Sequence, residues 1–463
     1  MVAQKKSLNI VLISTYELGR QPFGLASPAA WLRKEGFDVS QVDAAIYPLP
    51  DEKIVQANVI AFYIPMYTAA RLAIHLLNKV KQANPKAHLC FYGLYAPVNE
   101  NYLRNLGAHT ILGGEFEEGL VNLCKRLSGN GKINYTNNQN EQIISLSKLQ
   151  FQKPDRNDLP ALPTYAKLCE ENSPAKTTGY VEASRGCKHH CRHCPIVPIY
   201  NGRFRIIQKE IVLQDIRQQV EAGAQHITFG DPDFFNGPGH SMAIVQSLHE
   251  EFPDLSYDVT IKIEHLLKHQ KLLAILKETG CEIVTSAVES IDEHILKIFD
   301  KRHTREDFIK VVQIFDEISL NLNPTFVTFT PWTTISGYRE LLLLLNQLNL
   351  ILNISPIQLA IRLLIPEGSK LLEHTEAQEF FGNYNQGMLT YEWQNPDSRV
   401  EELFHGVRKI IHFGQQQGLS RHEIFEQIWN CTNEMSNQNT PFPENQNIRK
   451  RPTIPYLNEP WYC

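Results

Sequence analysis

The stretch "GYVEASRGCKHHCRHCP" (Gly179–Pro195) decides how the chain is interpreted, because it joins a strand pattern to three closely spaced cysteines. These are Cys187, Cys191 and Cys194, and three histidines lie among them. A structural zinc site needs four ligands, usually as two separated pairs, and no second cysteine pair follows at that distance. Three thiolates instead suit a [4Fe–4S] cluster whose fourth iron stays open for chemistry. Zinc completed by a histidine, and an electron-carrying cluster, are the alternatives.

The composition is that of a globular protein with more than one domain. The chain has 463 residues, of which 43% are hydrophobic and 21% charged, and its net charge is -5. A chain of this length exceeds one ordinary core. Without a basic surface, nucleic acid is a disfavoured partner. The N-terminus lacks a signal-peptide pattern, and the apolar stretch from Glu340 is too short to span a bilayer. We therefore expect no membrane association and a cytoplasmic location, which the six scattered cysteines also favour.

Residues 1–128 are predicted to form a Rossmann-like domain. Apolar runs alternate there with amphipathic segments, a pattern typical of βαβ units and an open parallel sheet. Ligands of such sheets bind at the carboxyl ends of the strands. Residues 129–175, which are rich in Asn and then in Pro, are predicted to be a linker.

Residues 176–375 are predicted to form a second α/β domain. Five candidate strands follow the first one at Gly179, and helical segments separate them. Six strand–helix repeats predict a partial (β/α)6 barrel, whose chemistry lies at the carboxyl ends of its strands. Residues 376–463 are predicted to be a helical region and an irregular tail. The five candidate strands are "HITFGD", "YDVTIKI", "EIVTSAVES", "NPTFVTFTP" and "PIQLAIRLLIP".

The spacing Cys-x3-Cys-x2-Cys after the first barrel strand resembles the signature of the radical S-adenosylmethionine (SAM) enzymes. In that family the open iron chelates SAM, and an electron from the cluster cleaves SAM to a 5′-deoxyadenosyl radical. The residue before the third cysteine is usually aromatic. Here it is His193, whose flat ring can also pack on adenine.

Further motifs agree with this resemblance, although each alone also fits a structural role. "FGDPDF" ends the second barrel strand and "AVES" ends the fourth, and "AIRLLIP" contains the predicted end of the sixth. The resemblance implies SAM contacts at His193, Gly230, Asp231, Asp233, Glu289, Ser290 and Arg362.

The N-terminal domain resembles the cobalamin-binding domain of the B12-dependent radical SAM enzymes. "GGEFEEGL" (Gly113–Leu120) is similar to that domain's closing segment. The first loop, "STYELGRQPFG", lacks the histidine that ligates cobalt in many cobalamin proteins, so the lower face of cobalt should lack a histidine ligand. A domain that binds nothing and packs on the barrel is the alternative. The implied cobalamin contacts are Thr15, Tyr16, Pro65, Met66, Tyr67, Gly93, Leu94, Tyr95, Gly113, Gly114 and Glu115.

The resemblance implies methyl transfer to an unreactive carbon of a small molecule or peptide, with a flavodoxin- or ferredoxin-type reductant. No residue identifies the substrate or a catalytic group. A radical SAM maturase without cobalamin is one alternative, and a non-catalytic iron–sulfur or zinc-binding scaffold is another. The acidic net charge disfavours an RNA methylthiotransferase.

The chain end resembles a narrower group, the CUAEP/CCAEP-tail radical SAM proteins. "RLLIPEGSKLL" and "LNEPWYC" carry the likeness, and the chain stops at Cys463, where a Cys or selenocysteine would follow. We hypothesise that a UGA selenocysteine codon follows Cys463 and that this thiol is redox-active. An ordinary chain end with a surface thiol is the alternative.

Overall fold

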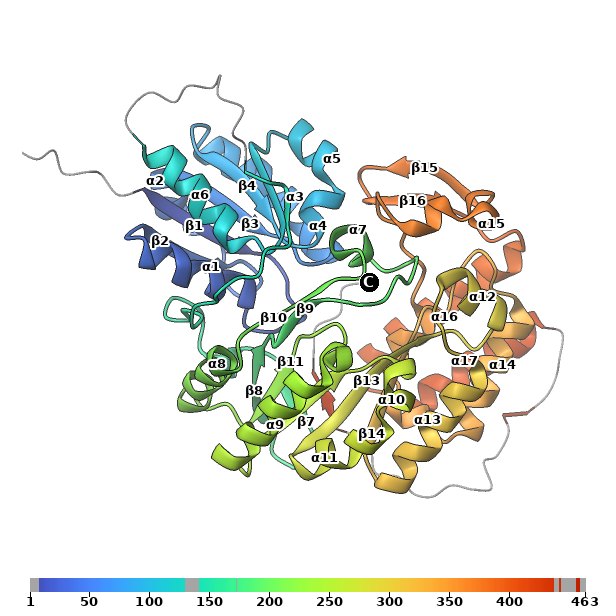
Figure 1. The fold of residues 1–463 in the computed structure, drawn as a ribbon. Coiled ribbons are helices and arrows are strands. Elements are labelled where there is room, and N and C mark those ends of the chain that lie inside the picture. The colour runs from blue at the N-terminus through green and yellow to red at the C-terminus, as the bar shows by residue number, and fades with distance from the viewer. Residues whose placement is uncertain (1–7, 130–140, 172, 437–440, 443–454, 459–463) are drawn as a thin grey trace, which may run out of the picture.

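The computed structural model describes residues 8–129, 141–171, 173–436, 441–442 and 455–458. Figure 1 shows two α/β units side by side, an N-terminal one in blue and a second one in green to orange, with β9 and β10 between them. Cys463, the predicted redox-active chain end, lies outside the described residues. Among the described residues, every helix is too short or too polar to cross a membrane.

The N-terminal unit is a parallel sheet of six strands in the order β2-β1-β3-β4-β5-β6. Alternate residues of β1 face opposite sides, as the period of two in a strand requires. Ile10 and Leu12 pack in one apolar cluster with α1 and α6, whereas Val11 and Ile13 pack in another with α3. The predicted open parallel sheet is confirmed. Its strands are β1 (Asn9–Ser14), β2 (Asp38–Asp43), β3 (Val59–Tyr63), β4 (His88–Tyr92), β5 (Thr110–Gly114) and β6 (Ile144–Ser145).

The helices of this unit cover both faces of its sheet (Figure 1). The strand order reverses between β1 and β3, and the crevice at such a point is where doubly wound sheets bind ligands. The helices are α1 (Phe23–Lys34), α2 (Asp51–Gln56), α3 (Tyr67–Ala83), α4 (Tyr95–Val98), α5 (Glu100–Asn105) and α6 (Glu117–Ser128).

The second unit is a curled half-barrel. Five parallel strands lie in the order β14-β13-β12-β11-β8, and β7 and β17 extend the β8 edge in antiparallel pairing. The α/β half-barrel that the sequence predicts is thus confirmed. The strands are β7 (Lys167–Cys169), β8 (Lys176–Val181), β9 (Ser184–Gly186), β10 (Phe204–Ile206), β11 (His226–Phe229), β12 (Ser256–Thr260), β13 (Cys281–Glu289), β14 (Asn321–Phe326) and β17 (Tyr456–Leu457).

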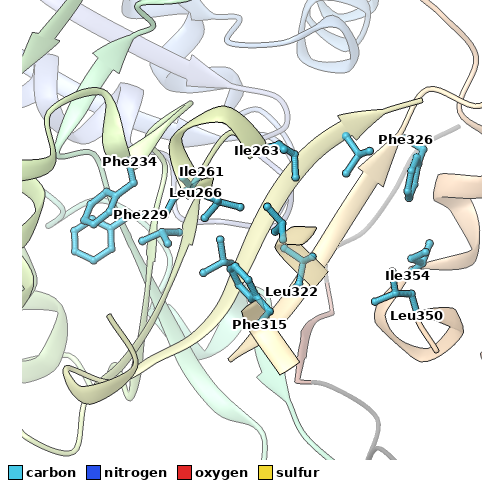
Figure 2. Packing of buried hydrophobic residues seen from close by; sticks show 14 of the residues in the cluster. Phe229, Phe234, Ile261, Ile263, Leu266, Phe315, Leu322, Phe326, Leu350 and Ile354 are labelled. Carbon is cyan, nitrogen blue, oxygen red and sulfur yellow. The ribbon is translucent and has the colours of Figure 1, made fainter. Parts of the chain in front are cut away.

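Outer helices pack on this sheet through a large apolar cluster. In Figure 2, Leu266 of α10 and Phe315 of α13 lie near the inner strands, and Leu322 of β14 belongs to the same cluster. The helices that pack there are α8 (Lys209–Glu221), α9 (Pro238–Glu251), α10 (Ile263–Lys268), α11 (Leu273–Glu278), α13 (Arg305–Ile318) and α14 (Ile335–Gln347). Two further helices pack elsewhere: α7 (Val197–Tyr200) on the apolar cluster of the N-terminal unit and α12 (Glu293–Phe299) in a smaller cluster.

The predicted sixth barrel strand is wrong in its extent. Residues Pro356–Ala360 form a 3-10 helix, and only one parallel bridge joins Phe329 to Arg362. Two hydrogen bonds make it, from Phe329 N to Ile361 O (3.0 Å) and from Leu363 N to Phe329 O (2.9 Å). Pro356 cannot donate to a sheet, which shortens the segment available for pairing.

The C-terminal region, predicted to be helical, contains two long helices, and it also contains a hairpin that the sequence did not predict. Helices α16 and α17 join the apolar cluster of the barrel. In the hairpin, Leu389 is buried in the N-terminal unit's cluster, and Tyr384 Oη donates to Asn99 Oδ1 (2.9 Å). The hairpin, which follows the barrel in the chain, therefore also packs on the N-terminal unit and connects the two units. These elements are α15 (Thr375–Gln378), β15 (Phe381–Asn385), β16 (Thr390–Trp393), α16 (Ser398–Gln416) and α17 (Arg421–Met435).

Arg156, in the segment between the two sheets, makes a buried bidentate ion pair with Asp215 of α8 at 2.7 and 2.8 Å. Their side chains are 8% and 2% exposed. The guanidinium also donates to Tyr180 O in β8 and to Gln21 Oε1 in the N-terminal unit. Arg156 thereby ties the connecting segment to both units.

We expect Arg156→Met to lower the free energy of unfolding by about 3–5 kcal/mol, because it leaves the Asp215 carboxylate buried without its cation. The control is Arg217→Met. Arg217 makes a bidentate pair of the same geometry with Glu251, but both side chains are 35% exposed. Its loss should cost less than about 1 kcal/mol. Urea denaturation followed by circular dichroism measures both, and equal losses would contradict the interpretation.

Candidate active site

The three clustered cysteines lie on the loop that joins β9 to β10. These two strands pair antiparallel and close the base of the loop. Gly186 precedes Cys187 with φ of +76°, and a Cβ added there would lie 2.3 Å from Tyr200 Cδ1 and 2.6 Å from Arg203 O. Only glycine fits this left-handed and crowded position. The loop geometry therefore depends on the "RGC" sequence.

The loop is held from both sides. The fully buried Asn236, which follows β11, accepts from Lys188 N (3.1 Å) and donates to Gly186 O (3.4 Å). On the other side, Arg192 Nη1 donates to Lys297 O and Ile298 O at the end of α12. These contacts fix the loop before any metal binds.

The three thiols form one electrostatic group. Burial raises the pKa of Cys187 to about 11 and that of Cys194 to about 12, and the neighbouring Cys191 raises both. Metal ligation requires thiolates, so binding must release these protons. Elsewhere among the described residues, Cys90, Cys124 and Cys281 are buried apart from this loop. The loop is therefore the place where the described chain concentrates sulfur ligands.

Asp233 lies beside the cysteine loop among histidines. Its Oδ2 is 2.6 Å from His265 Nδ1 and 3.4 Å from His189 Nε2, in both cases without hydrogen-bond alignment. Burial opposes ionisation of Asp233, but the two histidines hold its pKa below the usual value. Ligand atoms of Cys187, His189 and Asp233 lie within 4.8 Å of one another. This trio is an alternative metal-binding arrangement at the same loop.

Glu289 and His193 meet on the other side of the loop. Glu289 ends β13 with φ of +68°, a strained conformation for a residue other than glycine. Its Oε1 is 3.1 Å from His193 Nε2 and 3.4 Å from Lys301 Nζ. Burial opposes ionisation, but Lys301 and His193 lower the pKa of Glu289 to about 2. The His193 ring stacks on Phe299 with centroids 4.3 Å apart.

The remaining predicted SAM contacts serve the local structure. Asp231 accepts from Ala183 N (2.9 Å) and Ser184 Oγ (2.5 Å), and Gly230 N donates to Val181 O. Burial raises the pKa of Asp231 to about 7. Ser290 Oγ accepts from Asp292 N at the start of α12.

Arg362 is engaged away from the cysteine loop. Its guanidinium pairs with Glu401 of α16 (2.7 Å) and lies over the Trp393 ring, 3.6 Å from the centroid. The structure therefore brings together His193, Glu289 and Asp233 around the cysteines, but does not bring Arg362 to them.

A cavity of about 250 Å³ lies between the two units. On one side it is lined by the loops after β1, β3, β4 and β5, as expected for an open parallel sheet. On the other side it reaches Gly186 and Ile196, which flank the cysteines. Predicted residues that line it are Pro65, Met66, Gly93, Leu94 and Gly114. Predicted residues outside that lining are Thr15, Tyr16, Tyr67, Tyr95, Gly113 and Glu115.

Arg185, two residues before Cys187, crosses from the barrel to the N-terminal unit. It pairs with Glu117 at 2.8 and 3.0 Å, with Glu182 at 2.6 Å and with Glu115 at 3.4 Å. Its guanidinium also lies over the rings of Phe23, Phe116 and Phe151, between 4.8 and 5.6 Å from their centroids. This buried cation determines how the cysteine loop meets the other sheet.

Sequence reasoning missed four of these residues. Arg185, Asn236, His265 and Lys301 are all at least nine-tenths buried beside the cysteine loop. Charged and amide side chains are seldom buried without a partner. For Arg185, the sequence signal was the acidic "EFE" of Glu115–Glu117. The other three give no local signal, because each reaches the loop only through the fold.

Residues 181–334 match the family model described as the radical SAM superfamily. The chain therefore contains a radical SAM domain. A hopanoid C-3 methylase of Methylococcus capsulatus is 23% identical over 61% of this chain and 56% of its own length. The chain thus spans little more than half of that relative. An uncharacterized methyltransferase of Pyrococcus horikoshii is 24% identical over 86% of this chain and 84% of its own length.

Two solved structures share the fold. OxsB, a cobalamin-dependent SAM radical enzyme with aqua-cobalamin and SAM bound, aligns with a TM-score of 0.68 at 14% identity. The alignment covers 91% of this chain and 72% of OxsB. TsrM, a radical SAM methyltransferase from Kitasatospora setae with cobalamin and a [4Fe–4S] cluster bound, aligns with a TM-score of 0.56 at 14% identity, over 74% of this chain and 70% of TsrM. The likeness covers both units.

Glu115 should make stability depend on pH. Burial raises its pKa from 4.5 to about 7, although Arg185 and Tyr200 oppose the shift. Between these two values the folded chain binds more protons than the unfolded chain, so stability falls as pH rises through this window. We expect Glu115→Gln to make the slope of unfolding free energy against pH less negative, by up to about 1.4 kcal/mol per pH unit.

Denaturation midpoints measured across this pH range test the expectation. The control is Glu118→Gln, because Glu118 is exposed three residues further along. An unchanged slope in the Glu115 variant would show that its carboxyl does not take up the proton.

Proposed function

We propose that this radical SAM enzyme binds cobalamin between its two units and transfers a methyl group to an unreactive carbon of its substrate. The observation that supports the proposal is the cavity between the units. Strand-end loops of the N-terminal sheet form one wall, and residues flanking the cysteines form the other. A corrinoid placed there would lie beside the cluster loop.

The cysteine loop fits a [4Fe–4S] cluster. Cys187, Cys191 and Cys194 would hold three irons and leave the fourth for the amino and carboxylate groups of SAM. When bound, the cluster supplies the electron that cleaves SAM. Glu289 and Asp233, two ionised and buried carboxylates beside the loop, would contact the cationic and hydroxyl groups of SAM. His193, held by Glu289 and Phe299, would contact the adenine.

The cavity fits a corrinoid by its chemistry. Glu17 lines it, and its Oε2 is buried without a hydrogen-bond partner. Corrinoid side chains end in amides, whose N–H groups would satisfy that oxygen. No histidine is among the described residues that line the cavity. When bound, cobalamin supplies the methyl group. A whole corrinoid exceeds the cavity, so the loops after β1 and β3–β5 would have to move outward.

A zinc-binding scaffold is the second candidate, because Cys187, His189 and Asp233 can meet at one metal ion. A radical SAM enzyme without cobalamin is also consistent with the small cavity. The relationship to the CUAEP/CCAEP-tail group rests on the sequence of the chain end alone and stays a prediction.

Anaerobic purification with hydroxocobalamin, followed by metal and corrinoid analysis, distinguishes these functions. We expect about four iron atoms per chain, a corrinoid absorption band and a cluster spectrum that changes when SAM is added. Cys191→Ser should abolish the iron, whereas Cys431→Ala, a half-buried thiol on α17, should keep it. Zinc without iron would support the scaffold instead. Iron without corrinoid would leave a radical enzyme that does not use cobalamin.

Glu289→Gln should weaken SAM binding while the cluster stays in place. The change removes a buried charge that would face SAM, and a charge-assisted hydrogen bond contributes about 1.5–3 kcal/mol, or at least about tenfold in Kd. Equilibrium dialysis of SAM measures the loss, and iron content reports whether the loop is intact. Glu282→Gln, at the other end of β13 and one-third exposed, is the control. Unchanged SAM affinity in the Glu289 variant would remove this residue from the site.

A further inference from the structure

A second cavity, of about 460 Å³, lies inside the half-barrel. Its walls are the inner faces of β11, β12, β13 and β14. The segment Pro455–Asn458, which contains β17, also lines it, together with Gln415 of α16 and Arg421 of α17. Its volume is within the range of about 300–1,000 Å³ of typical small-molecule sites. We call this space the barrel chamber.

The inner wall of the barrel chamber is polar in a regular pattern. Asp258 and Thr260 of β12 both line it, and so do Asn323 and Thr325 of β14. The residues between and beside them point the other way, and Val259 and Leu322 belong to the apolar cluster under the outer helices. The rows are continuous across strands, because Thr260 pairs with Thr285, which pairs with Asn323.

This pattern is the opposite of a packed barrel. Closed (β/α)8 barrels fill their interior with branched apolar side chains. Here threonine, asparagine and aspartate occupy most inward positions beside Ile283 and Phe229. Some of them bond to one another, as Asn323 Nδ2 does to Thr285 Oγ1 (3.2 Å), but buried polar groups that are left without partners are costly. A polar ligand that bonds with them offsets that cost. The chamber therefore presents hydrogen-bonding groups that a polar ligand could use.

Two acceptors in the chamber lack protein donors. Asp258 Oδ1 accepts from Thr228 Oγ1 (2.6 Å) and lies 2.9 Å from His226 Nε2, but no described residue hydrogen-bonds to its Oδ2. Asn353 is 2% exposed and donates to Leu322 O (2.7 Å), while its Oδ1 is buried without a partner. Among the described residues, Asn353 Oδ1 is therefore a buried acceptor without a donor, and Asp258 Oδ2 is a further acceptor that an N–H or O–H group of a ligand can reach.

The barrel chamber adjoins the cavity between the two units. Leu18, Arg20, Gly230 and Pro232 line both spaces. Leu18 has a φ of +52°, so the loop after β1 is strained where the spaces meet. A ligand in the chamber would lie next to whatever occupies the other cavity.

We propose that the barrel chamber binds the substrate, and that this substrate is a compact polar molecule carrying an amino group and hydroxyl groups. The amino group pairs with Asp258, and the hydroxyl groups bond with the threonine and asparagine side chains. This inference rests on the proposed function, because it makes the chamber's occupant the methyl acceptor. It separates this chain from a methylase of apolar lipids, whose substrate could not satisfy Asp258 or Asn353.

Saturation-transfer NMR on the reconstituted full chain tests the proposal with five probes. Two are amine-bearing polyols, tris(hydroxymethyl)aminomethane and D-glucosamine. Two are their amine-free counterparts, pentaerythritol and D-glucose, and the fifth is toluene. We expect both amines to bind at millimolar concentration and more tightly than their counterparts, and toluene not to bind. Binding of toluene, or of none of the polyols, would overturn the proposal.

Variants locate the binding. Asp258→Asn should raise the Kd of the amine probes by at least about tenfold, because it removes a charge-assisted hydrogen bond. Asp254→Asn, an exposed position just before β12, should leave them unchanged. Thr325→Val keeps the shape of the wall and should weaken all four polyols. Equal binding by wild type and both chamber variants would overturn the assignment.

Saturating SAM identifies the occupant. If SAM leaves probe binding unchanged, the chamber holds a second ligand, as proposed. If SAM displaces the probes, the chamber is the SAM site and the proposal fails. Iron and corrinoid content of the same sample report on the proposed function separately. If the sample contains iron and corrinoid but the chamber binds toluene, the result rejects only the proposed substrate class and leaves the proposed function in place.

Discussion

The burial of Arg185 is the constraint on which the arrangement of the molecule depends. Its guanidinium is enclosed by three carboxylates and three phenyl rings that come from α1, the start of α6, the connecting segment and the end of β8. Burial disfavours the charged form, but Glu117, Glu182 and Glu115 keep the pKa of Arg185 well above its ordinary value. A buried ion cluster contributes little net stability, because desolvation offsets the attraction between the charges. Its effect here is that carboxylates from both units fix the direction of the Arg185 side chain. Gly186 and Cys187 follow directly, so the position of the cysteine loop is set by contacts that the N-terminal sheet supplies.

The same constraint explains why the functional spaces lie next to one another. Ile199 and Tyr200 of α7, which close the cysteine loop, are buried in the apolar cluster of the N-terminal unit. Tyr200 Oη also donates to Glu115 Oε1 (3.1 Å). The cysteine loop therefore packs on the N-terminal unit, although β8, the strand that leads into it, belongs to the barrel sheet. The cavity between the units and the chamber inside the barrel meet at the loop after β1 and at the end of β11.

Much of the fold followed from the sequence, because strands buried on both faces leave a clear apolar pattern. The runs before Thr15, Pro65 and Gly93 became β1, β3 and β4, and the three cysteines fell after the first barrel strand as predicted. The predicted extent of the sixth strand was wrong, because apolar content alone cannot show that a segment starting at Pro356 pairs through a single bridge. The hairpin β15–β16 was missed because its partner surface belongs to a domain nearly 300 residues earlier in the chain.

The grouping of several candidate site residues at one rim could be predicted from the sequence, but their individual contacts could not. Strand-end placement brought Asp231, Asp233 and Glu289 to one rim of the barrel, as parallel topology requires. Which of them is available to a ligand depends on contacts across the fold. Asp231 is bound to Ala183 N and Ser184 Oγ, whereas Asp233 and Glu289 face histidines and a lysine beside the cysteines.

The enclosed polar interior of the barrel likewise could not be recognised from the sequence alone. A strand such as "YDVTIKI" alternates polar and apolar residues, and that alternation by itself indicates one solvent-facing side. In the folded chain the polar side of β12 faces the chamber, and Asp258 is only 7% exposed. Closure of this side by Pro455–Asn458 and the neighbouring helices converts a solvated face into an enclosed one. Hydrogen-bonding groups that water would have satisfied on an open sheet then become available to select a ligand by its own donors.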